Sequence, residues 1–298
     1  MGQHYLSRLF APRAIAVFGA SDRPDTVGTM VFQNLQRGEF TGPLYPVNPQ
    51  RTEVGGVTCY PDLASLGKPV DLAVIATPAA TLPDIMQQCG EHGVSAAIVL
   101  SAGFRESGER GARLEQQMLD IARQHGIHLV GPNCLGVIRP SSGINATFSL
   151  TPARPGKLAL VSQSGAICTA ILDWAASNRV GFSTVVSLGA AADVDFGDVL
   201  DYLAGDGETE AILLYVEGLH SARGFMSALR AAARLKPVIA LKVGRHETGS
   251  RAATSHTGAL VGSDEAFDAA LSRSGVVRAM TIGQMFSAAR TLSSRYRS

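Results

Sequence analysis

The chain of 298 residues lacks the features of membrane, secreted and nucleic-acid-binding proteins. It has no run of 18 apolar residues, and its first residues lack the basic-then-apolar layout of a signal peptide. Its 26 Lys and Arg residues are balanced by 25 Asp and Glu residues, with no basic or acidic block. We therefore expect a cytoplasmic protein that binds neither membranes nor nucleic acids.

Cysteine is also scarce. Cys59, Cys89, Cys134 and Cys168 lie far apart and form no C-x-x-C pair, which disfavours a zinc site and a disulfide framework, so we expect no metal. In contrast, 46% of the residues are hydrophobic and 32 are glycine. This composition supports large cores joined by many turns, and the length suggests two domains.

Short apolar segments alternate with longer segments of helical period along the whole chain, which is typical of an α/β fold with parallel sheets. We expect two doubly wound, Rossmann-like or flavodoxin-like domains. The pattern breaks between Arg139 and Gly156, which predicts domains at 1–145 and 146–298. The predicted strands are 15–18, 44–47, 72–76, 97–100, 128–130, 157–162, 184–188, 212–216, 238–243 and 276–278. The predicted helices are 27–36, 82–92, 109–125, 166–177, 197–203, 222–235, 264–274 and 282–294.

A glycine turn follows the first predicted strand. Gly19-Ala20-Ser21-Asp22 leads into a helix, and such a turn presents N–H groups to a phosphate. The pattern G-x-G-x-x-G is incomplete because Ser21 takes the second glycine position, and the second strand ends in Val47-Asn48-Pro49 rather than in an acid that would bind a ribose hydroxyl. The segment therefore favours an adenine nucleotide other than NAD, although such a turn often serves only to reverse the chain.

Two segments of the second half are candidates for phosphoryl chemistry. Ser162-Gln163-Ser164-Gly165-Ala166 follows a strand and begins a helix, so its N–H groups could bind an anion, or a serine could simply cap the helix. Glu217 follows the strand 212–216. There its carboxylate could orient a catalytic histidine, or it could be only a charge at a helix N-terminus.

His256 lies in a long segment of small residues, 244–262, between a strand and a helix. Loops of this length in compact domains are usually functional or mobile, and small neighbours would let a phosphoryl group approach the imidazole. The chain has seven histidines, however, and a single histidine is more often a surface or packing residue. Cys134, after Gly131-Pro132-Asn133, is interpreted as a packing residue rather than a nucleophile.

Taken in order, seven segments of the chain resemble a known family. They are Gly19-Ala20-Ser21, Tyr45-Pro46-Val47-Asn48-Pro49, Ala76-Thr77-Pro78, Ser101-Ala102-Gly103-Phe104, Gly131-Pro132-Asn133-Cys134-Leu135-Gly136, Ser162-Gln163-Ser164-Gly165 and Ser255-His256-Thr257-Gly258-Ala259-Leu260. Over nearly the whole chain they resemble the α subunit of succinyl-CoA synthetase and the matching part of the NDP-forming acyl-CoA synthetases, such as ADP-forming acetyl-CoA synthetase.

The resemblance implies that the first domain binds coenzyme A or acyl-CoA. The residues that it assigns to CoA lie in the turns after the predicted strands. They are Gly19, Ala20, Ser21, Arg23, Val47, Asn48, Pro49, Ala76, Thr77, Pro78, Ser101, Ala102, Gly103 and Asn133.

The resemblance also implies a phosphohistidine in the second domain. His256 would be phosphorylated and Glu217 would orient it. In this chemistry acyl-CoA, orthophosphate and ADP are converted to a small carboxylic acid, CoA and ATP, through an acyl phosphate and then phosphohistidine. The residues that would bind the phosphate are Ser162, Ser164, Gly165 and Ala166.

The chain carries no lysine loop for nucleotide phosphates. The resemblance therefore implies that ATP or ADP, with magnesium, binds to an ATP-grasp domain or β subunit outside this sequence. We expect the chain to be the N-terminal part of a longer protein or one subunit of an oligomer.

A second resemblance is to the N-terminal region of Pat-type bacterial protein lysine acetyltransferases. It rests on Ile171-Leu172-Asp173-Trp174-Ala175, Leu200-Asp201-Tyr202-Leu203-Ala204 and Ile212-Leu213-Leu214-Tyr215-Val216-Glu217. It implies an alternative function, a non-catalytic region that senses CoA or acyl-CoA and regulates a C-terminal GNAT acetyltransferase domain. His256 keeps ligase chemistry possible, because some Pat-type proteins have lost that histidine. A third alternative, an NAD oxidoreductase, would need a ribose-binding acid that the second strand lacks.

Overall fold

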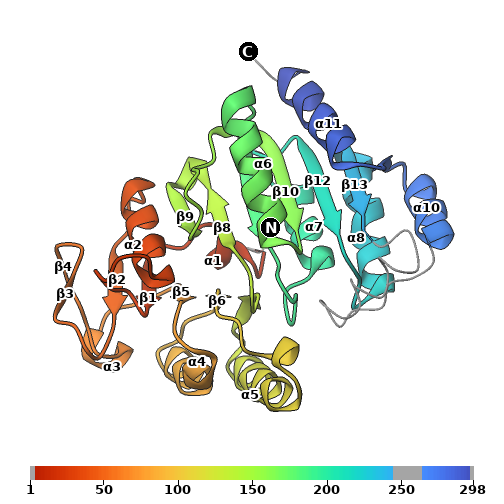
Figure 1. Cartoon of the computed structure of the whole chain (residues 1–298). Helices are drawn as coiled ribbons and strands as arrows, with labels where there is room; N and C mark the ends of the chain where they lie inside the picture. The colour runs from red at the N-terminus through yellow and green to blue at the C-terminus, as the bar shows by residue number, and fades with distance from the viewer. Residues whose placement is uncertain (1–3, 244–263, 296–298) are drawn as a thin grey trace. The chain divides into compact units, whose positions relative to one another are not determined.

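The computed structural model describes residues 4–243 and 264–295, which form two compact α/β units (Figure 1). Unit 1 comprises Met1–Leu150 and Ala191–Asp193, and unit 2 comprises Thr151–Ala190 and Val194–Ser298. The predicted α/β class with two parallel sheets is confirmed. The domain border predicted between residues 145 and 146 stays a prediction.

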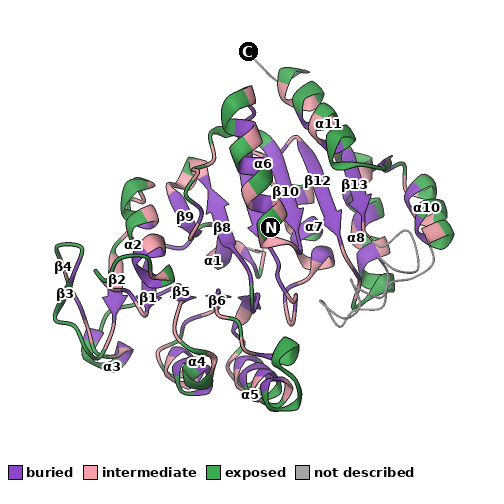
Figure 2. Cartoon of the chain, viewed as in Figure 1, coloured by how far each residue is buried: buried purple, intermediate pink, exposed green. Residues whose placement is uncertain are grey.

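The sheet of unit 1 has parallel strands in the order β2-β1-β5-β6-β7. Every residue of β1, β5 and β6 is buried (Figure 2), as expected for strands that helices cover on both faces. Each of the five predicted strands of the first half is present, displaced by at most one residue. Their bounds are β1 Ile15–Phe18, β2 Leu44–Val47, β5 Leu72–Ile75, β6 Ala96–Val99 and β7 His128–Val130.

Except for the short helix at Ser7–Phe10, whose caps are Leu6 and Ala11, the helices of unit 1 begin and end at polar or glycine caps. The hydroxyl of Thr26 accepts the N–H of Thr29 at the start of α2, and α5 ends at Gly126, whose φ is +67°. The short helices α1 and α3 were not predicted, because each has only four residues. The bounds are α1 Ser7–Phe10, α2 Val27–Arg37, α3 Leu63–Leu66, α4 Leu82–Glu91 and α5 Glu109–His125.

Two hairpins of unit 1 were also not predicted. Strand β3 (Glu53–Val54) pairs with β4 (Val57–Thr58), and β8 (Gly136–Arg139) pairs with β9 (Ile144–Thr147), both antiparallel. The β8–β9 hairpin lies where the sequence pattern suggested only a break. The apolar pattern of the sequence does not indicate this hairpin, because it contains buried polar residues. Arg139, Asn145 and Thr147 are at most 8% exposed.

Unit 2 contains parallel strands in the order β14-β13-β12-β10-β11. All five strands predicted for the second half are present, with ends that differ by at most two residues. Their bounds are β10 Pro155–Ser162, β11 Phe182–Ser187, β12 Ala211–Val216, β13 Val238–Lys242 and β14 Val277–Ala279.

Helices cover both faces of the unit 2 sheet (Figure 1). Trp174 of α6 stacks on Phe286 of α11 with ring centroids 4.5 Å apart, while Phe196 of α7 meets Phe225 of α8 edge to face at 6.0 Å. The bounds are α6 Gly165–Asn178, α7 Phe196–Gly205, α8 Ala222–Leu235, α10 Asp264–Arg273 and α11 Ile282–Arg295. None of the helices within residues 4–243 and 264–295 is long and apolar enough to cross a lipid bilayer.

Asp71 anchors the N-terminal segment of unit 1 to the sheet, just before β5. Its carboxylate accepts hydrogen bonds from the backbone N–H of Arg13 (2.7 Å), from the Arg13 guanidinium (3.1 and 3.2 Å) and from Arg8 (3.1 Å). Burial acts to raise the pKa of Asp71, but the hydrogen bonds from Arg13 and the charges of both arginines outweigh burial and hold this pKa below its usual value.

We expect Asp71→Asn to lower the free energy of unfolding by about 1–3 kcal/mol at pH 7, because the arginines lose their charged partner. A depressed folded-state pKa stabilises the fold above the unfolded pKa of about 3.9, and this stabilisation is lost as the pH falls through the folded pKa. The difference between the two proteins should therefore shrink in acid. Urea unfolding of both at several pH values measures it.

Asp120→Asn is the control, because the Asp120 and Arg123 side chains are 62% and 61% exposed. We expect this substitution to change the free energy of unfolding by less than about 0.5 kcal/mol. Equal effects of the two substitutions would contradict an anchoring role for Asp71.

Candidate functional site

The first candidate site lies where the strand order of unit 1 reverses. From β1 the chain continues to β2 on one side, whereas β5 lies on the other side of β1. Ligands of open α/β sheets bind at such a reversal, in the crevice outside the carboxyl ends of the strands. The predicted turns Gly19-Ala20-Ser21 and Ala76-Thr77-Pro78 follow β1 and β5, so they lie at this crevice.

Hydrogen bonds join the turn after β2 to the turn after β1, and they join the turns after β5, β6 and β7 to one another. The side-chain amide of Asn48 donates to the carbonyl of Ala20 (2.8 Å), the hydroxyl of Ser101 donates to the carbonyl of Thr77 (2.5 Å), and the N–H of Asn133 donates to the carbonyl of Ser101 (2.9 Å). The structure thus brings these predicted residues to one sheet edge. The other predicted residues of the same turns or strand ends are Val47, Pro49, Pro78, Ala102 and Gly103.

Two glycines of this site are required by close backbone approach. Gly19 has a φ of +82°, and a Cβ there would lie 3.0 Å from both the carbonyl oxygen of Ala76 and Cγ2 of Thr77. A Cβ on Gly28, in the first turn of α2, would lie 1.9 Å from the carbonyl oxygen of Gly19. The N-terminus of α2 therefore lies directly against the glycine turn, the arrangement that presents N–H groups to a phosphate.

Side chains from two directions hold the remainder of this turn. Oγ1 of Thr29 lies 2.7 and 2.8 Å from the carbonyl oxygens of Ser21 and Arg23, and Ser21 Oγ accepts the N–H of Arg23 (2.9 Å). Asp22, which stood out in the sequence only as part of the glycine turn, accepts the N–H of Gly55 at the tip of the β3–β4 hairpin (3.0 Å). The Arg23 side chain stays exposed, so its charge is available to an anion.

The second candidate site lies at the same kind of reversal in unit 2. Strand β10 has β11 on one side and β12 on the other, and Ser162 of β10 pairs with Tyr215 of β12. The turn Ser162-Gln163-Ser164 and the acid Glu217 follow these two strands. The structure therefore brings two of the predicted features of unit 2 together at one crevice.

The turn after β10 both caps α6 and leaves N–H groups available. Ser162 Oγ accepts the N–H of Ser164 (3.0 Å), and Ser164 Oγ accepts the N–H of Ile167 (3.3 Å). The N–H groups of Gly165 and Ala166 make no hydrogen bond to another described residue. The alternative that a serine only caps the helix is thus compatible with anion binding, because different groups serve each purpose.

Glu217 is half-buried at the end of β12, where Gln163 holds its backbone. Oε1 of Gln163 accepts the N–H groups of Glu217 (2.7 Å) and Gly218 (3.0 Å). Burial and, second, the charge of Glu217 raise the pKa of Tyr215 to about 12, so this phenol stays protonated at neutral pH. In the sequence, Gln163 stands out only as part of a motif, because its partners lie 54 and 55 residues away.

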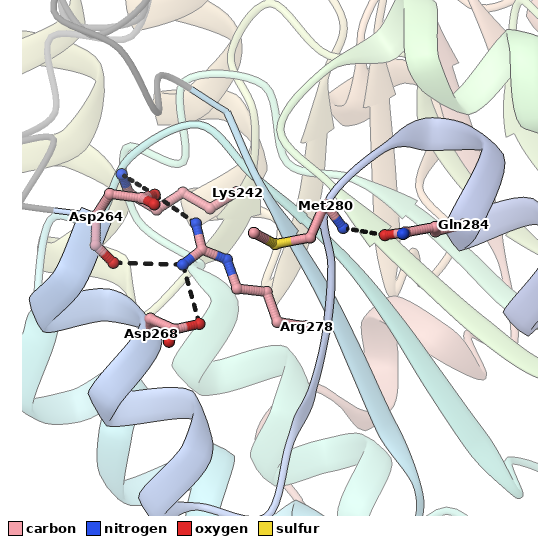
Figure 3. Close-up of polar contacts among 6 residues, drawn as sticks. All are labelled: Lys242, Asp264, Asp268, Arg278, Met280 and Gln284. Carbon is pink, nitrogen blue, oxygen red and sulfur yellow. Dashed lines mark hydrogen bonds and ion pairs between the residues drawn. The ribbon is translucent and has the colours of Figure 1, made fainter.

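His256 lies outside the described residues, which stop at Val243 and resume at Asp264. These two ends are close together, because Lys242 Nζ lies 3.7 Å from the carboxylate of Asp264 (Figure 3). Arg278 also pairs with Asp264 and donates to Asp268 (3.1 Å). Burial lowers the pKa of Lys242 despite Asp264. Both ends lie at the carboxyl edge of the sheet, since Lys242 pairs with Val216 of β12.

The cysteines of both units are unsuited to nucleophilic chemistry. Cys134 is buried, and its thiol donates to the carbonyl of Val99 (3.3 Å). Cys168 lies in the first turn of α6, but burial raises its pKa to about 12. In the part of the chain that the structure describes, no three His, Cys, Asp or Glu side chains are grouped to hold a metal ion.

Comparison with known proteins assigns both units. Residues 13–140 match a CoA binding domain, and residues 155–292 match a succinyl-CoA ligase like flavodoxin domain. The chain is 45% identical over 281 residues to ADP-forming acetate–CoA ligase I of Archaeoglobus fulgidus, covering 94% of this chain and 41% of that protein. It is 42% identical to the α subunit of ADP-forming acetate–CoA ligase I of Pyrococcus furiosus, covering 97% of this chain and 63% of that subunit.

A solved structure agrees with these sequence matches. The dinucleotide forming acetyl-coenzyme A synthetase 1 of Ca. Korarchaeum cryptofilum, in complex with phosphate and ADP, superposes with a TM-score of 0.92 at 36% identity. The match covers 97% of this chain and 62% of that one. The chain therefore carries a CoA binding domain and a succinyl-CoA ligase like flavodoxin domain, and it is similar to ADP-forming acetate–CoA ligases.

These matches confirm the first resemblance seen in the sequence. The chain corresponds to the α portion of these synthetases and spans about two fifths to three fifths of the length of the relatives described. Those relatives are acyl-CoA ligases or ligase subunits, and they give no support to the Pat-type resemblance or to a regulatory GNAT-linked function.

We expect Gly28→Ala to lower the free energy of unfolding of unit 1 by about 1–3 kcal/mol, because the added methyl forces α2 away from the Gly19 carbonyl. Urea unfolding followed by circular dichroism measures the change. Gly205→Ala is the control, since a Cβ there meets no atom within 4 Å. A Gly28→Ala protein as stable as the control would show that the two backbones are not in close contact.

Proposed function

We propose that this chain is the CoA-binding and phosphohistidine-bearing part of an ADP-forming acid–thiol ligase. The overall reaction converts acyl-CoA, orthophosphate and ADP into a carboxylic acid, CoA and ATP. The proposal is carried by the crevice of unit 2, where the Ser162–Ala166 turn and Glu217 follow neighbouring strands. The synthetase relatives, which align over almost the whole chain, support it independently.

Unit 1 fits the nucleotide end of CoA. The close packing of Gly28 on Gly19 leaves room for backbone N–H groups, but not for a side chain, at the head of α2. Bound CoA would supply the thiol that exchanges acyl groups. The residues that we propose to hold it are Gly19, Ala20, Ser21, Arg23, Val47, Asn48, Pro49, Ala76, Thr77, Pro78, Ser101, Ala102, Gly103 and Asn133.

Unit 2 would hold the phosphoryl group. A ring nitrogen of His256 attacks the phosphorus of the acyl phosphate, an N–P bond forms, and the carboxylate leaves with the electrons of the broken P–O bond. Glu217 accepts a hydrogen bond from the other ring nitrogen and keeps the imidazole in the reactive tautomer. The N–H groups of Gly165 and Ala166, next to the Ser162 and Ser164 hydroxyls, stabilise the phosphoryl charge.

The number of residues between His256 and Asp264 is large enough for this role. The described chain resumes at Asp264, eight residues after His256, and eight extended residues span up to about 26–29 Å. Asp264 pairs with Lys242, whose neighbour on the next strand is Val216, directly before Glu217. The carboxyl edge that carries Glu217 therefore lies within reach of the histidine.

The proposed reaction needs a nucleotide-binding partner. We propose an ATP-grasp domain or β subunit that binds ADP or ATP with magnesium, and hence an oligomeric or longer enzyme in the cytoplasm. The alignment with only part of each ligase supports this view. Acetate is the first carboxylic acid to test, because relatives are named as acetate–CoA ligases.

We expect the chain, incubated with acetyl-CoA and radiolabelled orthophosphate, to acquire an acid-labile phosphoryl label. His256→Ala should abolish this label, because the nucleophile is lost, and leave the calorimetric Kd for CoA within about twofold. His92→Ala, at a half-buried position of unit 1 outside both candidate sites, should retain the label. Label that persists in His256→Ala would assign the phosphoryl group to another residue, and CoA binding without any label would favour a sensing function.

A further inference from the structure

Gln163 is a buried polar residue that the proposed chemistry does not use directly. It lies between the two serines of the turn after β10 and is only 4% exposed. Its backbone N–H donates to the carbonyl of Tyr215 (3.3 Å), which continues the pairing of β10 with β12 beyond Ser162. Its side chain then crosses the crevice toward the turn that carries Glu217.

The side-chain oxygen of Gln163 receives two hydrogen bonds from that turn. Oε1 accepts the N–H of Glu217 at 2.7 Å and the N–H of Gly218 at 3.0 Å. An amide oxygen has two lone pairs, so both are used by consecutive backbone donors. Because only the oxygen can accept, these contacts also fix which way the amide faces.

We propose that Gln163 is a positioning residue for Glu217, and this inference rests on the proposed phosphohistidine function. The Cα of Glu217 is held at a set distance from the Ser162–Ala166 turn through one rigid amide group. The backbone of Glu217, from which the carboxylate projects, is thereby fixed relative to the N–H groups that would hold the phosphate. A flexible turn would let the acid point elsewhere, and the imidazole would lose its orientation.

Backbone hydrogen exchange tests the contact itself. Gln163→Met keeps the length of the side chain and removes the acceptor. We expect the amide protons of Glu217 and Gly218 to exchange at least about tenfold faster in Gln163→Met than in the unsubstituted chain, while those of Leu129 and Ile98 in unit 1 keep their rates. Unchanged exchange at Glu217 and Gly218 would overturn the proposal.

The rate of labelling by acetyl-CoA and radiolabelled orthophosphate tests the function. Gln163→Met should slow labelling about tenfold or more and leave the apparent KM for orthophosphate within about twofold. In a Glu217→Gln background the same substitution should slow labelling less than about threefold, because its effect passes through the carboxylate. A purely structural role would instead slow both backgrounds equally.

The outcomes separate the two proposals. No label in the unsubstituted chain would overturn the proposed function and, with it, this role of Gln163. Normal labelling of the unsubstituted chain together with an unimpaired rate in Gln163→Met would overturn the positioning role alone. A raised KM for orthophosphate at an unchanged maximal rate would also overturn it, because Gln163 would then bind the phosphate directly.

Discussion

Both candidate sites depend on one constraint, the parallel pairing of β1 with β5 in unit 1 and of β10 with β12 in unit 2. In unit 1, Phe18 at the end of β1 pairs with Ile75 at the end of β5, and in unit 2, Ser162 at the end of β10 pairs with Tyr215 of β12. The strands of each pair end nearly level, so the turns that follow them must be neighbours. A crevice with polar backbone groups on both sides results in each unit, whatever the side chains are.

The two units hold the turns beside the crevice together in different ways. In unit 1 the backbones themselves come together, which only glycine permits at positions 19 and 28. In unit 2 the amide of Gln163 spans the gap and pairs with two N–H groups that β12 leaves at its end. Close backbone approach leaves no room for a side chain at the turn of unit 1, whereas the side-chain bridge in unit 2 fixes the backbone of Glu217.

The strands could be predicted from the sequence because a buried strand appears there as a continuous apolar segment. Strands covered on both faces are continuous apolar runs that stop at Gly, Asn or Ser, so their ends were placed within one or two residues. The β8–β9 hairpin escaped because Arg139, Asn145 and Thr147 are buried polar residues whose partners come from the fold. Gln163 and the Lys242–Asp264–Arg278 cluster were missed for the same reason, since each depends on contacts distant in sequence. The prediction for His256 came from motif resemblance.

The burial of the cysteines has a consequence for a protein whose relatives handle thioesters. Thioesters transfer their acyl groups to thiolates, and a thiolate on the protein surface would compete with the intended acceptor. Here all four cysteines are buried, and burial raises the pKa values of Cys89 and Cys168 to about 12. At neutral pH these two thiols stay protonated and enclosed, which makes them poor nucleophiles.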